Sequence, residues 1–199
     1  MLILSRLFYY FYFLRTPKRT TPSDPNFFIS PANWRVVSII YTDTDMINIE
    51  KDHKNALQLF TADMEWPFTV ISIMLTPLDV HFQKSPCTCT FLSSVYQPGK
   101  FINAVSKAEN LNATFNNENM QSLFQTTHGY KFKIVQIAWF IARRIVSFCE
   151  AWSQYTPGEP IWLIKLGSQV TVVFDKNITC CTAVGVYLID LESVIWTMS

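Results

Sequence analysis

The chain has 199 residues, of which 49% are hydrophobic. This is enough apolar side chain for a packed core, and it excludes an intrinsically disordered chain. The formal net charge of +1 gives no overall field that would attract nucleic acid, so no nucleic-acid partner is expected. Charged residues make up only 16% of the chain, aromatic residues reach 15%, and there are 5 glycines. Such a composition is typical of a membrane-associated protein, and equally of an open reading frame that selection has not shaped.

Residues 1–33 are interpreted as a membrane-leaning or targeting extension that ends in a proline-rich linker. An aromatic run covers residues 2–14, and the positive charges of this region come before any acidic residue: Arg6, Arg15, Lys18 and Arg19. The run is shorter than the roughly 20 apolar residues of a transmembrane helix. It therefore predicts contact with a membrane surface and a membrane-associated location. A mitochondrial presequence and a buried or disordered tail are the alternatives.

Residues 34–199 are predicted to form a single α+β domain that is rich in strands at its C-terminal end. The patterns of β-branched and aromatic residues predict strands over 36–41, 46–50, 68–75, 91–96, 161–166, 170–174 and 178–191. Apolar residues at helical spacing predict a helix between 49 and 64, which Pro67 ends. Residues 101–126 are ambiguous, because their apolar spacing is helical while their many asparagines disfavour a helix.

The best-defined predicted element is one long amphipathic helix over residues 133–152. Its polar residues fall mostly on one narrow stripe of a helical surface, and apolar residues fill the remainder. Arg143 and Arg144 lie near its middle, where each would cost about 2.5–3.5 kcal/mol in a bilayer, so a membrane-spanning helix is disfavoured. The pattern predicts a core helix with a solvated edge, with an interfacial helix as the alternative.

Five cysteines stand at positions 87, 89, 149, 180 and 181. On a strand, Cys87 and Cys89 would point to one face, which suits a thiolate metal site or cross-strand disulfides. Neither close pair has the usual C-x₂₋₄-C spacing of zinc ligands, and an odd number leaves one thiol unpaired. The favoured interpretation is that they are ordinary small buried residues.

One motif points to a specific chemistry. The segment Tyr41-Thr-Asp-Thr-Asp45 resembles the Y-x-D-T-D turn of family B DNA polymerases, in which a strand–turn–strand presents acidic side chains to two magnesium ions. This resemblance implies Asp43 and Asp45 as the metal-facing pair. The family's other acidic motif and its lysine-bearing nucleotide motif have no counterpart in the residues before Tyr41. The resemblance therefore implies a remnant of such a metal-binding turn, and the alternative is a polar hairpin turn.

Other catalytic patterns are missing from the sequence. There is no nucleophile elbow, no phosphate-binding loop and no dinucleotide fingerprint, and the histidines at 53, 81 and 128 share no ligand spacing. No cofactor is expected, and a non-enzyme is favoured over an enzyme. The sequence predicts no assignable activity, as in an orphan translation product without evolved function. A small membrane-associated interaction protein and the polymerase-like remnant are the alternatives.

Overall fold

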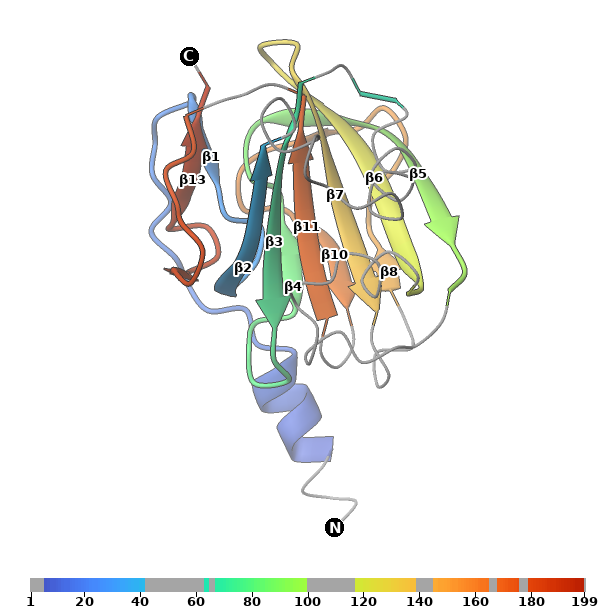
Figure 1. Ribbon diagram of the computed structural model, residues 1–199. Helices are drawn as coiled ribbons and strands as arrows, with labels where there is room; N and C mark the ends of the chain where they lie inside the picture. The colour runs from blue at the N-terminus through green and yellow to red at the C-terminus, as the bar shows by residue number, and fades with distance from the viewer. Residues whose placement is uncertain are drawn as a thin grey trace.

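The computed structural model describes residues 6–41, 63–64, 67–99, 117–138, 145–164, 168–175 and 179–198. Within these ranges the chain consists mainly of strands and contains one short helix, η1 (Phe8–Phe13), which projects from one end of the molecule in Figure 1. The strands are β1 (Phe27–Ile29), β2 (Trp34–Tyr41), β3 (Thr69–Leu75), β4 (Phe82–Lys84), β5 (Cys89–Gln97), β6 (Asn119–Thr126), β7 (Lys131–Ala138), β8 (Ile145–Ser147), β9 (Gln154–Tyr155), β10 (Pro160–Ile164), β11 (Ser168–Phe174), β12 (Tyr187–Leu188) and β13 (Val194–Thr197).

These strands form three sheets, and every pairing within them is antiparallel. The largest sheet has eight strands in the order β12-β2-β3-β11-β7-β6-β5-β9. A three-stranded sheet, β4-β10-β8, lies behind it in Figure 1, and the β1-β13 pair lies at its side. The core is therefore enclosed between sheets, as in a β-sandwich.

Strand β11 is paired along both edges. Val172 lies opposite Ile71 of β3 on one side and Ile134 of β7 on the other. Val170 and Val172 pack into the larger hydrophobic cluster, while Val173 packs into a second cluster on the opposite face of the sheet. Because the strand is buried on both faces, its sequence is apolar without strict alternation.

Aromatic rings join the three sheets in the main core. The ring of Phe28 in β1 stacks on Trp196 of β13 at 4.3 Å and meets Phe132 of β7 edge-on at 4.9 Å. Trp162 of β10 meets Phe124 of β6 edge-on at 5.3 Å. These rings are all no more than 1% exposed. Since each buried aromatic side chain removes a large apolar area from water, this cluster is a major source of stability.

The predicted α+β class and the predicted helix over 133–152 are both wrong. Residues 131–138 form β7 and residues 145–147 form β8, and η1 is the only helix among the residues described. Lys133 and Gln136, which the helical pattern placed on a solvated edge, are 3% and 0% exposed. Both faces of β7 are buried, so its sequence does not show the alternation of hydrophobic and polar residues that marks a half-buried strand. Its few polar residues happen to stand at a helical spacing, which is why the pattern predicted a helix.

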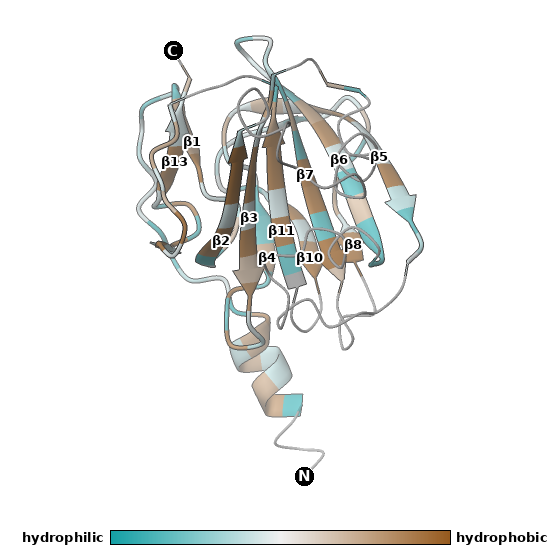
Figure 2. Cartoon of the chain, viewed as in Figure 1, coloured by the Kyte–Doolittle hydropathy of each residue, from teal (hydrophilic) through white to brown (hydrophobic). Residues whose placement is uncertain are grey.

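Most predicted strands within the described residues are confirmed. The strands expected at 36–41, 68–75, 91–96, 161–166 and 170–174 correspond to β2, β3, β5, β10 and β11. Figure 2 shows hydrophobic colour along most of β2 and β3, which is the signal that predicted them. The long strand expected over 178–191 is wrong, because within the described residues 179–191 only Tyr187–Leu188 is a strand. The elements expected at 46–50 and 49–64 lie almost wholly outside the described residues, and 119–126 of the ambiguous segment is β6.

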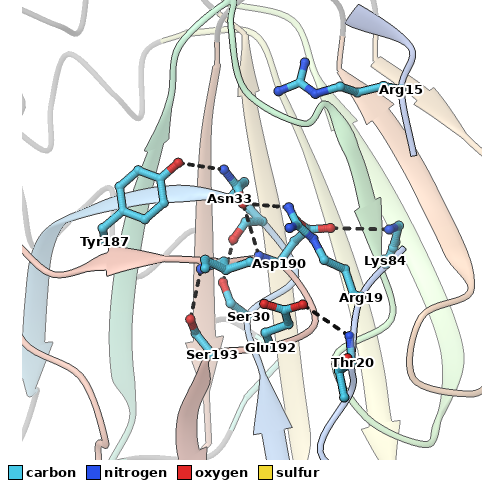
Figure 3. A network of polar contacts seen from close by, with 12 residues as sticks. Arg15, Arg19, Thr20, Ser30, Asn33, Lys84, Tyr187, Asp190, Glu192 and Ser193 are labelled. Atoms are coloured by element: carbon cyan, nitrogen blue, oxygen red, sulfur yellow. Dashed lines mark hydrogen bonds and ion pairs between the residues drawn. The ribbon is translucent and has the colours of Figure 1, made fainter. Parts of the chain in front are cut away.

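The N-terminal residues run along the sheets and are tied to the C-terminal part. The prolines predicted no regular structure over residues 16–33; this holds for 16–26 but is wrong for Phe27–Ile29, which form β1 and pair with β13. The division of the chain at residue 33 stays a prediction. Figure 3 shows the polar contacts that hold this segment: Asp190 lies between Arg19 and Lys84.

Asp190 is a fully buried carboxylate with two cationic partners. Arg19 donates from Nε and Nη2 to Oδ1 at 3.0 and 2.7 Å, and Lys84 Nζ lies 3.3 Å from Oδ2. Asn33 Oδ1 accepts from Arg19 Nη2 and from the Asp190 backbone N–H, both at 3.3 Å, while its Nδ2 donates to the Tyr187 hydroxyl at 3.0 Å. A buried charge is tolerated when it is paired and hydrogen-bonded in this way.

We predict that Asp190→Asn lowers the free energy of unfolding by about 3 kcal/mol, because it leaves the nearly buried Lys84 ammonium without its carboxylate. Denaturant unfolding of the variant measures this loss. The double variant Asp190→Asn/Lys84→Met should recover part of it, since the uncompensated charge is then gone. Glu192→Gln, which alters a solvent-exposed contact of the same region, is the matched control and should change stability little. An Asp190→Asn protein as stable as the parent would contradict the prediction.

Candidate active site

The candidate site centres on a buried histidine in the connection between β3 and β4. A turn over Thr76–Asp79 follows β3, and the Asp79 carboxylate Oδ2 closes it by accepting from the Thr76 backbone N–H at 2.7 Å and from the Thr76 hydroxyl at 2.6 Å. His81 follows two residues later and is 0% exposed. Its Nδ1 lies 2.8 Å from the backbone carbonyl oxygen of Asp79. The turn therefore holds the ring directly through its own backbone.

Helix η1 covers one side of the His81 ring. The Phe13 ring lies 3.9 Å from the imidazole, centroid to centroid, and is itself 0% exposed. Arg15 fastens the helix to the same turn, since its Nη2 donates to the Leu78 carbonyl at 2.7 Å and its guanidinium lies over the Tyr12 ring at 4.0 Å. In Figure 1 the end of η1 accordingly lies beside the connection that follows β3.

Burial sets the protonation state of His81. It lowers the pKa of the imidazole to about 4, since the charged form is poorly solvated; the hydrogen bond with Asp79 opposes this shift and the nearby positive charge of Arg15 adds to it. The imidazole is therefore neutral at neutral pH. A carbonyl oxygen can only accept, so Nδ1 carries the proton and the ring's lone pair is on Nε2. A neutral imidazole in this tautomer is suited to proton transfer.

Two buried amides connect the His81 segment to the large sheet. Gln83 of β4 donates from Nε2 to the His81 carbonyl at 2.8 Å, and Gln136 of β7 donates from Nε2 to Gln83 Oε1 at 3.1 Å. Both glutamines are 0% exposed. The site thus draws on η1, the β3–β4 turn, β4 and β7.

Two of the five thiols lie elsewhere in the core, at the start of strand β5. Cys87 and Cys89 are buried, and a hydrogen bond between the two thiols raises the pKa of Cys87 and lowers that of Cys89. All five cysteines are free thiols, and no group of three or more potential metal ligands occurs in the part of the chain that the structure describes. The interpretation of the cysteines as small buried residues is therefore confirmed for Cys87 and Cys89, whereas Cys149 and Cys180 are half-buried and it is wrong for Cys181, which is exposed.

The sequence also singled out a pair of acidic residues and two further histidines. Asp43 and Asp45, the pair implied by the polymerase-like turn, lie outside the described residues, as does His53. His128 is exposed in the turn between β6 and β7. Metal-ligand spacing does not single out His81, because it shares no such spacing with His53 or His128. The signal that could have found it is the polar pair in Asp79-Val-His81, shortly after an apolar strand, together with the polar residues Gln83 and Lys84 in the next strand.

The exposed surface beside the site is aromatic. Leu7, Phe8, Tyr10, Phe11 and Tyr12 of the helical segment are between 38% and 79% exposed, and Leu78 of the β3–β4 turn is 59% exposed. Among the described residues, no helix is long and apolar enough to cross a membrane.

Comparison with known proteins identifies the family. A family model described as phosphatidylserine decarboxylase matches residues 7–189. The chain is 34% identical over 176 residues to the phosphatidylserine decarboxylase proenzyme of Pelagibacter ubique, covering 88% of this chain and 73% of that protein. It is 32% identical over 185 residues to the proenzyme of Beijerinckia indica, covering 92% of this chain and 72% of that protein, and 29% identical over 184 residues to that of Geotalea uraniireducens, covering 92% and 76%.

These matches overturn three interpretations of the sequence. The chain is not an orphan product without assignable activity, and it is not the remnant of a polymerase. The preference for a non-enzyme is also wrong, because the relatives are enzymes. The low charge and low glycine content that suggested an unselected reading frame occur here in a chain with many relatives. The chain belongs to the phosphatidylserine decarboxylase family, a family of enzymes.

Proposed function

We propose that this chain removes the carboxyl group of phosphatidylserine and that His81 takes part in the proton transfer. The C–C bond to the carboxylate breaks, CO₂ leaves, and the bonding electron pair stays on the α-carbon. A proton then adds to that carbon, which yields a phosphatidylethanolamine headgroup. The observation that carries this proposal is a neutral histidine enclosed beneath an exposed aromatic helix, in a chain of this family.

The chemistry places two demands on the protein. The electron pair left by CO₂ needs an electron-accepting group, such as a carbonyl conjugated to the substrate's amine. The relatives are named proenzymes, and we infer that this chain is likewise a precursor whose covalent processing yields the active form. The second demand is a group that can take up and return a proton away from bulk water. Neutral His81, held through Nδ1 by Asp79, meets that demand.

The location of the substrate supports the proposed membrane contact. Phosphatidylserine is a membrane lipid, which agrees with the membrane association expected from residues 1–33. We propose that η1 lies in the bilayer interface with its exposed aromatic side chains among the lipids, and that the basic residues Arg6, Arg15 and Lys18 lie near anionic headgroups. Leu78 of the turn that holds His81 would lie at the same surface. A mitochondrial location stays a prediction.

We predict that His81→Asn lowers the decarboxylation rate by about 10²–10⁴-fold, because it removes the group that transfers the proton. The assay follows CO₂ release from phosphatidylserine in mixed vesicles, using protein whose processing is checked by mass spectrometry against the 23.0 kDa intact chain. His128→Asn, at an exposed turn, is the matched control and should retain full activity. Full activity of His81→Asn would rule out its role, whereas a wild-type protein that is processed but inactive would contradict the function itself.

We predict that binding to vesicles containing phosphatidylserine weakens by about tenfold when Phe11 is replaced by Ser, since a ring that is 79% exposed would no longer enter the interface. Co-sedimentation with vesicles measures this binding, and added salt should weaken it further through the basic residues. Tyr96→Ser is the control, because Tyr96 is 52% exposed on β5 but lies outside η1. Equal binding by Phe11→Ser and the parent would exclude this mode of docking.

The low pKa of His81 also predicts a pH dependence of stability. The unfolded chain takes up a proton at His81 near pH 6.5, whereas the folded protein does so only near pH 4. The stability contributed by the neutral, buried ring is therefore complete above about pH 6.5 and falls as the pH drops towards 4, by roughly 3 kcal/mol in all. Unfolding free energies of wild type and His81→Asn, measured from pH 4 to 8, isolate this effect as the difference between the two curves. Parallel curves over that range would contradict it.

A further inference from the structure

The Gln83–Gln136 pair is a polar connection between two sheets inside an otherwise apolar core. Gln83 lies in β4 of the three-stranded sheet, and Gln136 lies in β7 of the large sheet. Their side chains meet at 3.1 Å, and each residue is 0% exposed. The neighbours of Gln136 on the same face of β7 are Ile134 and Ala138, both members of the main hydrophobic cluster.

The direction of this hydrogen-bond chain follows from its first acceptor. The His81 backbone carbonyl can only accept, so the Gln83 group that reaches it is the Nε2 amide. Gln83 Oε1 then faces Gln136, which must donate through its own Nε2. This orientation leaves Gln136 Oε1 buried without a hydrogen-bond partner among the described residues. An unpaired buried acceptor costs stability, and two apolar residues of the same size would avoid that cost.

The amide pair acts on the segment that carries the imidazole. The carbonyl of His81 accepts from Gln83 Nε2 and, at 3.4 Å, from the Ile164 backbone N–H of β10. Ile164 belongs to the same small sheet as β4, so it does not tie this segment to the large sheet. Gln136 ties this segment to the large sheet, because it lies in β7, which pairs with the central strand β11 over the whole length of β11. The amide pair therefore helps to fix the position of His81 relative to the large sheet.

We propose that Gln83 and Gln136 are positioning residues for the decarboxylation: they brace the backbone of His81 against β7 and so keep the imidazole in its working position. This inference rests on the proposed function. It accounts for a buried polar pair with an unsatisfied oxygen, which stability alone does not favour. A displacement of about 1 Å at a reacting group can cost about 100-fold in rate, so a brace of this kind matters to catalysis.

The test separates positioning from stability. Gln136→Met and Gln83→Met should each lower the melting temperature, because each leaves its former partner unpaired, and each should lower kcat by about 10- to 100-fold with little change in KM. In the double variant Gln83→Met/Gln136→Met no amide is left unpaired, so the melting temperature should recover while kcat stays low. Recovery of kcat together with the melting temperature would overturn the proposal and leave the pair a purely structural feature.

A control and a second readout complete the experiment. Ser72→Ala removes another buried side-chain hydrogen bond, the 3.1 Å contact with Thr171, and should lower the melting temperature without changing kcat. The His81 imidazole signal in an NMR titration needs no substrate, so it tests the brace even if the wild type does not decarboxylate phosphatidylserine. In the double variant the imidazole pKa should rise towards its ordinary value as the ring becomes better solvated. An unchanged imidazole pKa would overturn the proposal. If the methionine variants do not fold, Gln136→Asn, which keeps the amide but shortens its reach, gives the same test.

Discussion

Strand β11 pairs with β3 along one edge and with β7 along the other, over all seven of its residues. Because both of its faces are also buried, its register leaves its two neighbours no freedom to slip. The end of β3 fixes where the Thr76–Asp79 turn begins, and hence where His81 emerges. The register of β7 fixes the place of Gln136. The site therefore inherits its geometry from a strand that carries none of its identified side chains.

The core meets the cost of burying ionisable groups in two different ways. Asp190 keeps its charge, and two cations together with Asn33 replace the water it has lost. His81 loses its charge instead, because burial disfavours the charged form of the imidazole and the nearby guanidinium of Arg15 disfavours a second positive charge. The imidazole is therefore neutral. Lys84, only three residues along the chain from His81, lies in the charged cluster, so one end of the short strand β4 carries a structural ion pair and the other end adjoins a neutral imidazole.

The crowding of β-branched residues decided which strands the sequence predicted. Strands 36–41 and 170–174 were predicted correctly because β-branched residues crowd them, and that preference holds in the half-buried β2 as well as in β11, which is buried on both faces. Residues 133–138 were wrongly assigned to a helix because Lys133 and Gln136 stand three residues apart, and polar residues at that spacing in a core strand resemble the polar edge of a helix. The polar residues concerned are the ones with a specific role: Gln136 joins the brace, and Lys133 pairs with Asp63 at 3.0 Å. Positive-φ positions at Trp152 and Leu191, which both lie in turns, show how this chain makes turns with few glycines. The site itself needed the fold, since Phe13, His81 and Gln136 are far apart in sequence.

The aromatic N-terminus connects the composition of the chain to its chemistry. A run of exposed Phe and Tyr side chains next to basic residues is unfavourable for a protein surrounded by water. When only the sequence is considered, such a run suggests a chain under little selection. In the structure, one face of that run is needed by the protein itself, because Phe13 covers His81 and excludes water from the ring. The opposite face is exposed, and it is the face that a lipid substrate's bilayer can cover. In the proposed function, the helix that docks on the bilayer also forms one wall of the candidate site, so binding to the lipid surface and enclosing the imidazole depend on the same few residues.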